Sequence, residues 1–227
     1  MILKHSLVEG EIIEIKPFIF AAIIKDKYDR SMVFCRYQEY YESPFPEIRG
    51  NSFSLEEYMR IYSKRNKKDT FTYPVDWSGY NVPSNVLMEA RKKFEGSLND
   101  YDLVMDDMIS YCNRESKFRN YGETHPWYLI GVDKLKSSII NHEIAHGLYY
   151  TNLNYKVEMD YHTSSILLKD SISLRKHLIK VGYVNDGKIL DDEIQAYMST
   201  GKLHSWSDTI YKKYSKEFVN TFKKYNK

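Results

Sequence analysis

The sequence predicts an α+β fold with a small antiparallel or mixed sheet and a mostly helical C-terminal half. The apolar, β-rich segments, at 11–24, 31–40 and 127–132, all fall in the first 132 residues. After residue 133, most segments combine helical spacing of apolar residues with capping residues. No internal repeat, low-complexity tract or clear linker divides the chain. We therefore expect one domain over 1–227, with a β/α part over about 1–132 and a helical part over about 133–227.

Three segments are expected to supply the strands. The segments 11–24 and 31–40 flank the polar residues 25–30, which predicts a β-hairpin. The short apolar segment 127–132 predicts a further strand. Residues 70–84, which lie between the second and third of these segments, contain Pro74, Gly79 and Pro83 and predict a long aromatic loop. The simpler interpretation of this loop is that it covers an edge of the core, and the alternative is a functional loop.

Helices are expected over most of the remaining chain, each located by helical spacing and in several cases by a capping residue. Three expected helices have a capping residue: 54–62 with Ser54, 84–94 with Ser84, and a helix to about 113 that begins at Asn99 or Asp100. The other expected helices are 140–148, 163–181, 190–198 and 209–225.

Composition excludes several classes of protein. The 33 basic and 31 acidic residues leave a net charge of +2, which gives no case for a nucleic-acid or membrane partner. The two cysteines, Cys35 and Cys112, are expected to be reduced and buried. Residues 1–11 lack a signal-peptide apolar region, and the longest apolar run, 18–24, is too short to span a bilayer. These features predict a cytoplasmic protein, unless a non-classical secretion route is used; they do not set its oligomeric state.

The pattern H-E-x-x-H occurs once, at His142, Glu143 and His146. Histidines four positions apart lie on one face of a helix, so both imidazoles can reach one metal ion. Glu143 lies about 100° around the helix from His142, where its carboxylate can take a proton from a water molecule. This arrangement is typical of zinc-dependent hydrolysis.

The surroundings of this pattern favour a helix. Asp133 is a candidate N-cap, no proline interrupts the segment, and Ile140, Ile144 and Leu148 form an apolar stripe. The alternative interpretation is an amphipathic core helix whose histidines form ordinary hydrogen bonds.

A catalytic zinc ion needs a third protein ligand. The pattern with Gly at position 149 and His at position 152 is excluded, because the chain has Tyr149 and Asn152 there. Glu193 is preferred, since it opens an expected helix whose apolar residues can pack against the histidine helix. The remaining candidates are Glu158, Asp160 and His162. Asp192 is not expected to substitute for Glu193, because it points about 100° away on the same helix.

With His142, Glu143, His146 and Glu193, the chain resembles the zincin metallopeptidases of the gluzincin type, over about 127–200. The resemblance implies that Glu193 is the third zinc ligand, on a second helix packed against the first. It also implies that an antiparallel edge strand, supplied by 127–132, precedes the histidine helix. The interval from His146 to Glu193 is longer than in the simplest members, so 160–188 would be a helical insertion.

We therefore expect a zinc-dependent peptidase acting on a peptide or protein, with Zn²⁺ on His142, His146 and Glu193 and with Glu143 as the general base. An extended substrate would pair with 127–132 by strand addition. His204 is the preferred donor to the oxyanion that hydrolysis creates, ahead of Tyr149, Tyr150 and Tyr197. Tyr197 could also hold the Glu193 carboxylate. The alternatives are a hydrolase of another amide, a non-catalytic zincin-like metal-binding or interaction protein, and a structural helix without metal.

Overall fold

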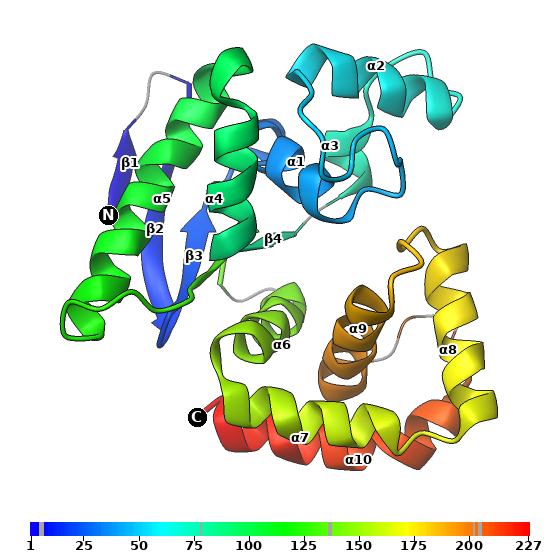
Figure 1. Cartoon of the computed structure of the whole chain (residues 1–227). Coiled ribbons are helices and arrows are strands. Elements are labelled where there is room, and N and C mark those ends of the chain that lie inside the picture. The colour runs from blue at the N-terminus through cyan, green and yellow to red at the C-terminus, as the bar shows by residue number, and fades with distance from the viewer. Residues whose placement is uncertain (5–6, 78, 136–137, 202, 204–205) are drawn as a thin grey trace. The chain divides into compact units, whose positions relative to one another are not determined.

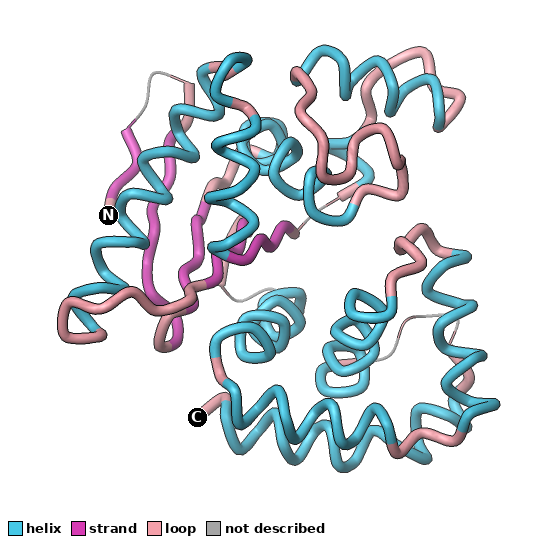
Figure 2. The backbone as a smooth tube through the Cα atoms, in the orientation of Figure 1, coloured by secondary structure: helices cyan, strands magenta, loops and turns pink. Residues whose placement is uncertain are grey.

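The structure, a computed structural model, describes residues 1–4, 7–77, 79–135, 138–201, 203 and 206–227 (Figure 1). The chain divides into two compact units, Met1–Ser137 and Ser138–Lys227. The first contains a sheet with helices, and the described part of the second is entirely helical (Figure 2). The expected α+β class is confirmed, and the division between the units lies close to the expected change of character at about 132.

The sheet of the first unit is mixed and has five strands in the described residues. Its spatial order is β1-β2-β3-β5-β4, and only β3 and β5 run parallel. The strands are β1 (Ile2–Lys4), β2 (Glu9–Lys16), β3 (Ile19–Ile23), β4 (Tyr80–Pro83) and β5 (Tyr128–Val132).

The expectation that 127–132 is an edge strand is wrong. β5 lies between β3 and β4 and pairs with both, so neither of its edges can accept a peptide strand. The edge on this side of the sheet is β4, which was expected to belong to a loop. There the Asn81 N–H donates to Gln38 Oε1 at 3.0 Å, and Pro83 has no N–H to offer. Strand addition at 127–132 is therefore excluded.

The expected hairpin between 11–24 and 31–40 is also wrong, because 31–40 belongs to helix α1 (Lys27–Glu42). Asp26 caps this helix by accepting the Asp29 N–H at 2.9 Å. Residues 30–40 of α1 are all buried, including the polar Arg30, Arg36, Gln38 and Glu39, so no exposed polar face marks the helix in the sequence. The hairpin instead forms within 11–24, from β2 and β3, with Phe18 in the left-handed region at φ 64°.

Among the other helices of the first unit, α2 and α4 lie close to the expected positions, α5 continues to Arg119 beyond its expected end at about 113, and the short α3 falls in the segment expected to be a loop. Ser54 caps α2 and Asn99 caps α5 with a full capping box, as expected. Ser84 is not a cap, since it is the first residue of its helix and its hydroxyl accepts the Trp127 N–H at 3.1 Å. The helices are α2 (Leu55–Arg65), α3 (Tyr73–Asp76), α4 (Ser84–Lys93), the 3₁₀ turn η1 (Glu95–Ser97) and α5 (Asp100–Arg119).

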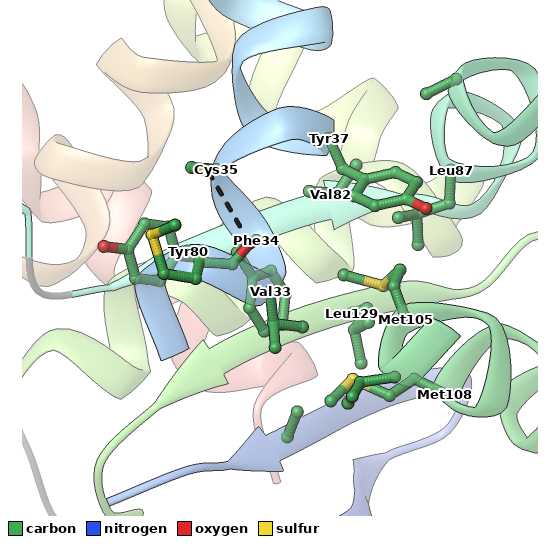
Figure 3. Close-up of a cluster of buried hydrophobic side chains, with 14 of the residues drawn as sticks. Val33, Phe34, Cys35, Tyr37, Tyr80, Val82, Leu87, Met105, Met108 and Leu129 are labelled. Carbon is green, nitrogen blue, oxygen red and sulfur yellow. Dashed lines mark hydrogen bonds between the residues drawn. The ribbon is translucent and has the colours of Figure 1, made fainter. Parts of the chain in front are cut away.

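The core of the first unit lies where α1, α4 and α5 meet the sheet (Figure 3). The Phe34 ring of α1 packs on β5 at Gly131, where a Cβ would approach the ring to 2.7 Å. Glycine is therefore the residue that lets helix and strand approach this closely. Cys35 and Cys112 are buried and reduced, as expected.

The second unit is built around α9, which packs against α6, α7, α8 and α10. Its helices are α6 (Ser138–Thr151), α7 (Leu153–Ser164), α8 (Leu168–Lys180), α9 (Gly187–Thr200) and α10 (Asp208–Tyr225). The expected helix 163–181 is thus shorter, because 163 and 164 end α7. Asp133 lies five positions before α6 begins and is not its cap. Among the described helices, none is long and apolar enough to cross a membrane.

Candidate metal centre

Helix α6 presents His142 and His146 to the same point. Their spacing of four residues aligns the two side chains, and their Nε2 atoms lie 3.1 Å apart. His146 is buried and His142 is half-buried. Two imidazole nitrogens this close, each with a lone pair available in the neutral ring, form half of a metal site.

Helix α9 brings Glu193 to these nitrogens from 47 positions further along the chain. Its Oε1 lies 3.6 Å from His146 Nε2, and its Oε2 lies 3.7 Å from His142 Nε2. Ligand atoms of these three residues all lie within 4.8 Å of one another. α6 and α9 pack directly against each other within the second unit, which makes this meeting possible.

The spacing of these atoms fits a tetrahedral zinc ion. Zinc bonds of 2.0–2.2 Å place neighbouring ligands about 3.3–3.6 Å apart in a tetrahedron. The two Nε2 atoms are 3.1 Å apart, and each has one oxygen of the Glu193 carboxylate at 3.6 or 3.7 Å, so small side-chain rotations would bring one oxygen within reach of a shared ion. Glu193 Oε2 is also buried, without a hydrogen-bond partner in the part of the chain that the structure describes. A buried carboxylate oxygen of this kind is costly unless a cation or a donor satisfies it.

The other candidates for the third ligand are engaged elsewhere. Glu158 binds Lys224 and Tyr225 on α10, at 2.6 and 2.7 Å. Asp160 pairs with Lys156 and accepts from the Tyr149 hydroxyl. His162 Nε2 lies 2.9 Å from Thr221 Oγ1. None of these three is in the cluster with His142 and His146.

Charge in the cluster is strongly negative for a buried site. Burial alone would lower the pKa of His146, but Asp192, Glu193 and Glu143 raise it to about 10. Burial alone would raise the pKa of Glu193, but His146, His142 and Tyr183 hold it below its usual range. Carboxylates that stabilise positive charge on a buried imidazole would equally stabilise a metal cation held there.

Asp192 has a place that the sequence interpretation missed. Helical geometry turns it about 100° away from Glu193, which led us to expect no part for it. Its Oδ1 instead lies 2.9 Å from His146 Nδ1, on the far side of the ring from Glu193. An imidazole has two nitrogens, so two adjacent carboxylates on one helix can each approach a different nitrogen of the same ring. The consecutive acidic residues Asp192 and Glu193 were the feature of the sequence that could have predicted this contact.

Two tyrosines line the other side of the cluster. The Tyr197 ring lies over His142, with 4.3 Å between ring centroids, and its hydroxyl is 2.9 Å from that of Tyr183. Tyr183 contributes to the lowered pKa of Glu193, so its hydroxyl acts on that carboxylate from beside the Tyr197 hydroxyl. The sequence interpretation did not single out Tyr183, which lies in the connection between α8 and α9.

Glu143, the expected general base, is buried beside the two histidines, and its charge acts on His146. Tyr149 is turned toward Asp160, and Tyr150 is half-buried on α6. His204, the preferred oxyanion donor, lies outside the described residues.

No protein-family model, no curated protein and no solved structure matches this chain. The function of the chain is therefore inferred from the side chains that meet in the second unit.

Proposed function

We propose that His142, His146 and Glu193 hold a zinc ion and that the chain is a zinc-dependent hydrolase, most simply a peptidase of the gluzincin type. The observation that carries this proposal is the meeting of two Nε2 atoms 3.1 Å apart with the Glu193 carboxylate, whose Oε1 lies 3.6 Å from His146 Nε2 and whose Oε2 lies 3.7 Å from His142 Nε2. We also propose that the chain has a zincin-like fold.

The residues divide the chemistry between them. When bound, zinc would polarise a water molecule and the scissile carbonyl. Glu143, next to His142 on α6, takes a proton from the attacking water and passes it to the leaving amine. Tyr183 lies beside the Glu193 carboxylate, and the Tyr197 ring packs against the His142 ring.

The substrate is proposed to be a peptide or protein, as the resemblance implies. Its binding by strand addition at β5 is not part of the proposal, because both edges of β5 are occupied.

Glu143→Gln tests the proposal, because it removes the proton acceptor and leaves every proposed ligand in place. Hydrolysis of a mixed peptide library, followed by mass spectrometry, should fall by at least about 10²-fold, the lower end for loss of a general base. Bound zinc, measured by elemental analysis, should stay at the level of the unmodified protein. Glu158→Gln, a surface carboxylate on α7, is the matched control and should retain activity.

Two outcomes contradict parts of the proposal. Loss of zinc in Glu143→Gln would make Glu143 a ligand rather than a base. Zinc binding by the unmodified chain without hydrolysis of any amide would favour a non-catalytic metal-binding protein.

A further inference from the structure

A row of buried polar contacts leads from His146 away from the candidate metal centre. Asp192 Oδ1, which lies beside His146 Nδ1, accepts a hydrogen bond from Gln195 Nε2 at 2.8 Å. The same Nε2 donates to the Ala145 carbonyl at 3.3 Å, and Gln195 Oε1 accepts from the Tyr155 hydroxyl at 2.9 Å. The row thus joins α7, α9 and α6.

The chemistry of these groups allows one direction of hydrogen bonding. A backbone carbonyl can only accept, so the Ala145 oxygen requires the NH₂ group of Gln195 on its side. The Tyr155 hydroxyl then meets the amide oxygen. Gln195 is fully buried, with 0 % of its surface exposed, which keeps water from competing for these bonds.

This fixed amide determines what Asp192 can do. Its Oδ1 receives an N–H from Gln195 and lies 2.9 Å from His146 Nδ1, in an ion-pair contact rather than an aligned hydrogen bond. In the zinc-bound protein, the neutral His146 ring would keep its proton on Nδ1, beside Asp192, and offer the lone pair of Nε2 to the metal. Asp192 alone would be less constrained, because its side chain is 20 % exposed.

We propose that Gln195, held by Tyr155 and the Ala145 carbonyl, is a positioning residue that fixes Asp192 and through it the metal-binding tautomer and orientation of His146. This inference rests on the proposed zinc centre. Gln195 touches neither the ligand atoms nor a substrate, and it acts through Asp192.

Gln195→Met tests this proposal, since methionine keeps the length of the side chain but offers no amide. Zinc affinity, measured by competition with a chromophoric chelator, should weaken about 10–100-fold, the usual effect of losing a partner behind a metal ligand. The visible spectrum of the Co²⁺-substituted protein should also change, because a loosened His146 alters the ligand field. Asp191→Asn is the matched control: Asp191 adjoins Asp192 but pairs with Arg175, so affinity and spectrum should stay unchanged.

The outcomes separate this inference from the proposed function. A Gln195→Met protein with the zinc affinity and Co²⁺ spectrum of the unmodified chain overturns the positioning role and leaves the zinc centre intact. An unmodified chain that binds no zinc overturns both. Should Gln195→Met fail to fold, Tyr155→Phe carries the test, because it removes only the hydroxyl that holds Gln195; unchanged affinity and spectrum would then overturn the proposal.

Discussion

Buried charge is handled differently in the two units. In the first unit, Arg36 of α1 binds the Asp102 carboxylate, the Phe53 carbonyl and both oxygens of Ser97, and its guanidinium lies 3.9 Å from the centre of the Phe94 ring. Both terminal nitrogens of the Arg36 guanidinium therefore donate to acceptors within the first unit. In the second unit, carboxylates gather around two imidazoles and one carboxylate oxygen has no donor in the described residues.

The difference separates a structural use of buried charge from a binding site. Both terminal nitrogens of Arg36 have acceptors without a ligand, and only its Nε lacks a partner in the described residues, so folding alone explains this geometry. The cluster of His142, His146 and Glu193 brings two imidazole nitrogens and a carboxylate together in a way that could hold a cation, which we propose to be zinc.

The largest expected effect breaks the second cluster. Glu193→Ala removes one of three proposed ligands, and two histidines alone cannot close the site, so zinc should no longer be retained through gel filtration. Elemental analysis of the purified variant provides the measurement. Glu158→Ala is the control and should keep zinc; equal zinc content in both variants would rule out Glu193 as a ligand.

The next effect breaks the first cluster and concerns stability alone. Arg36→Met leaves Asp102 buried without its cation, which should lower the free energy of unfolding by about 3–5 kcal/mol in urea titrations. Arg91→Met removes the partly exposed pair with Asp106 and should cost about 0–1 kcal/mol. Zinc content should be the same in both variants, and a zinc deficit in the folded Arg36→Met protein would contradict the comparison.

The smallest effect sharpens the contrast between the units. Free zinc at 100 times its dissociation constant should stabilise the folded second unit by about 2.7 kcal/mol. Hydrogen exchange should therefore slow most in α6 and α9, with α1 as the internal reference. Slowing confined to α1, or no slowing in α9, would contradict the assignment.

These contrasts also explain which features could be predicted from the sequence. The spacing of His142 and His146 is local, so helical geometry alone places both rings on one face. Glu193 is 47 positions away, and its approach depends on the packing of α6 against α9. The apolar side of its expected helix and the resemblance were the two grounds that favoured it over Glu158, Asp160 and His162. Asp192 was set aside because its direction was judged relative to Glu193, not relative to the second nitrogen of His146.

In the first unit, the errors come from tertiary structure that local patterns do not encode. Residues 30–40 are buried on all sides and mix apolar with polar side chains, so their pattern could not distinguish α1 from a strand. The composition of 127–132 predicted a strand correctly, but the order of strands in a sheet depends on segments far apart in the chain. β4, at 80–83, is too short and too close to two prolines to give a recognisable pattern.

The most direct test of the central claim is a zinc-loaded crystal structure with anomalous diffraction recorded at the zinc absorption edge. We predict a single strong peak within about 2.0–2.2 Å of His142 Nε2, His146 Nε2 and a carboxylate oxygen of Glu193, with Glu143 close by but not coordinated. A peak elsewhere, such as at Glu158 or His162, or a coordination sphere that includes Glu143 in place of Glu193, would contradict the account.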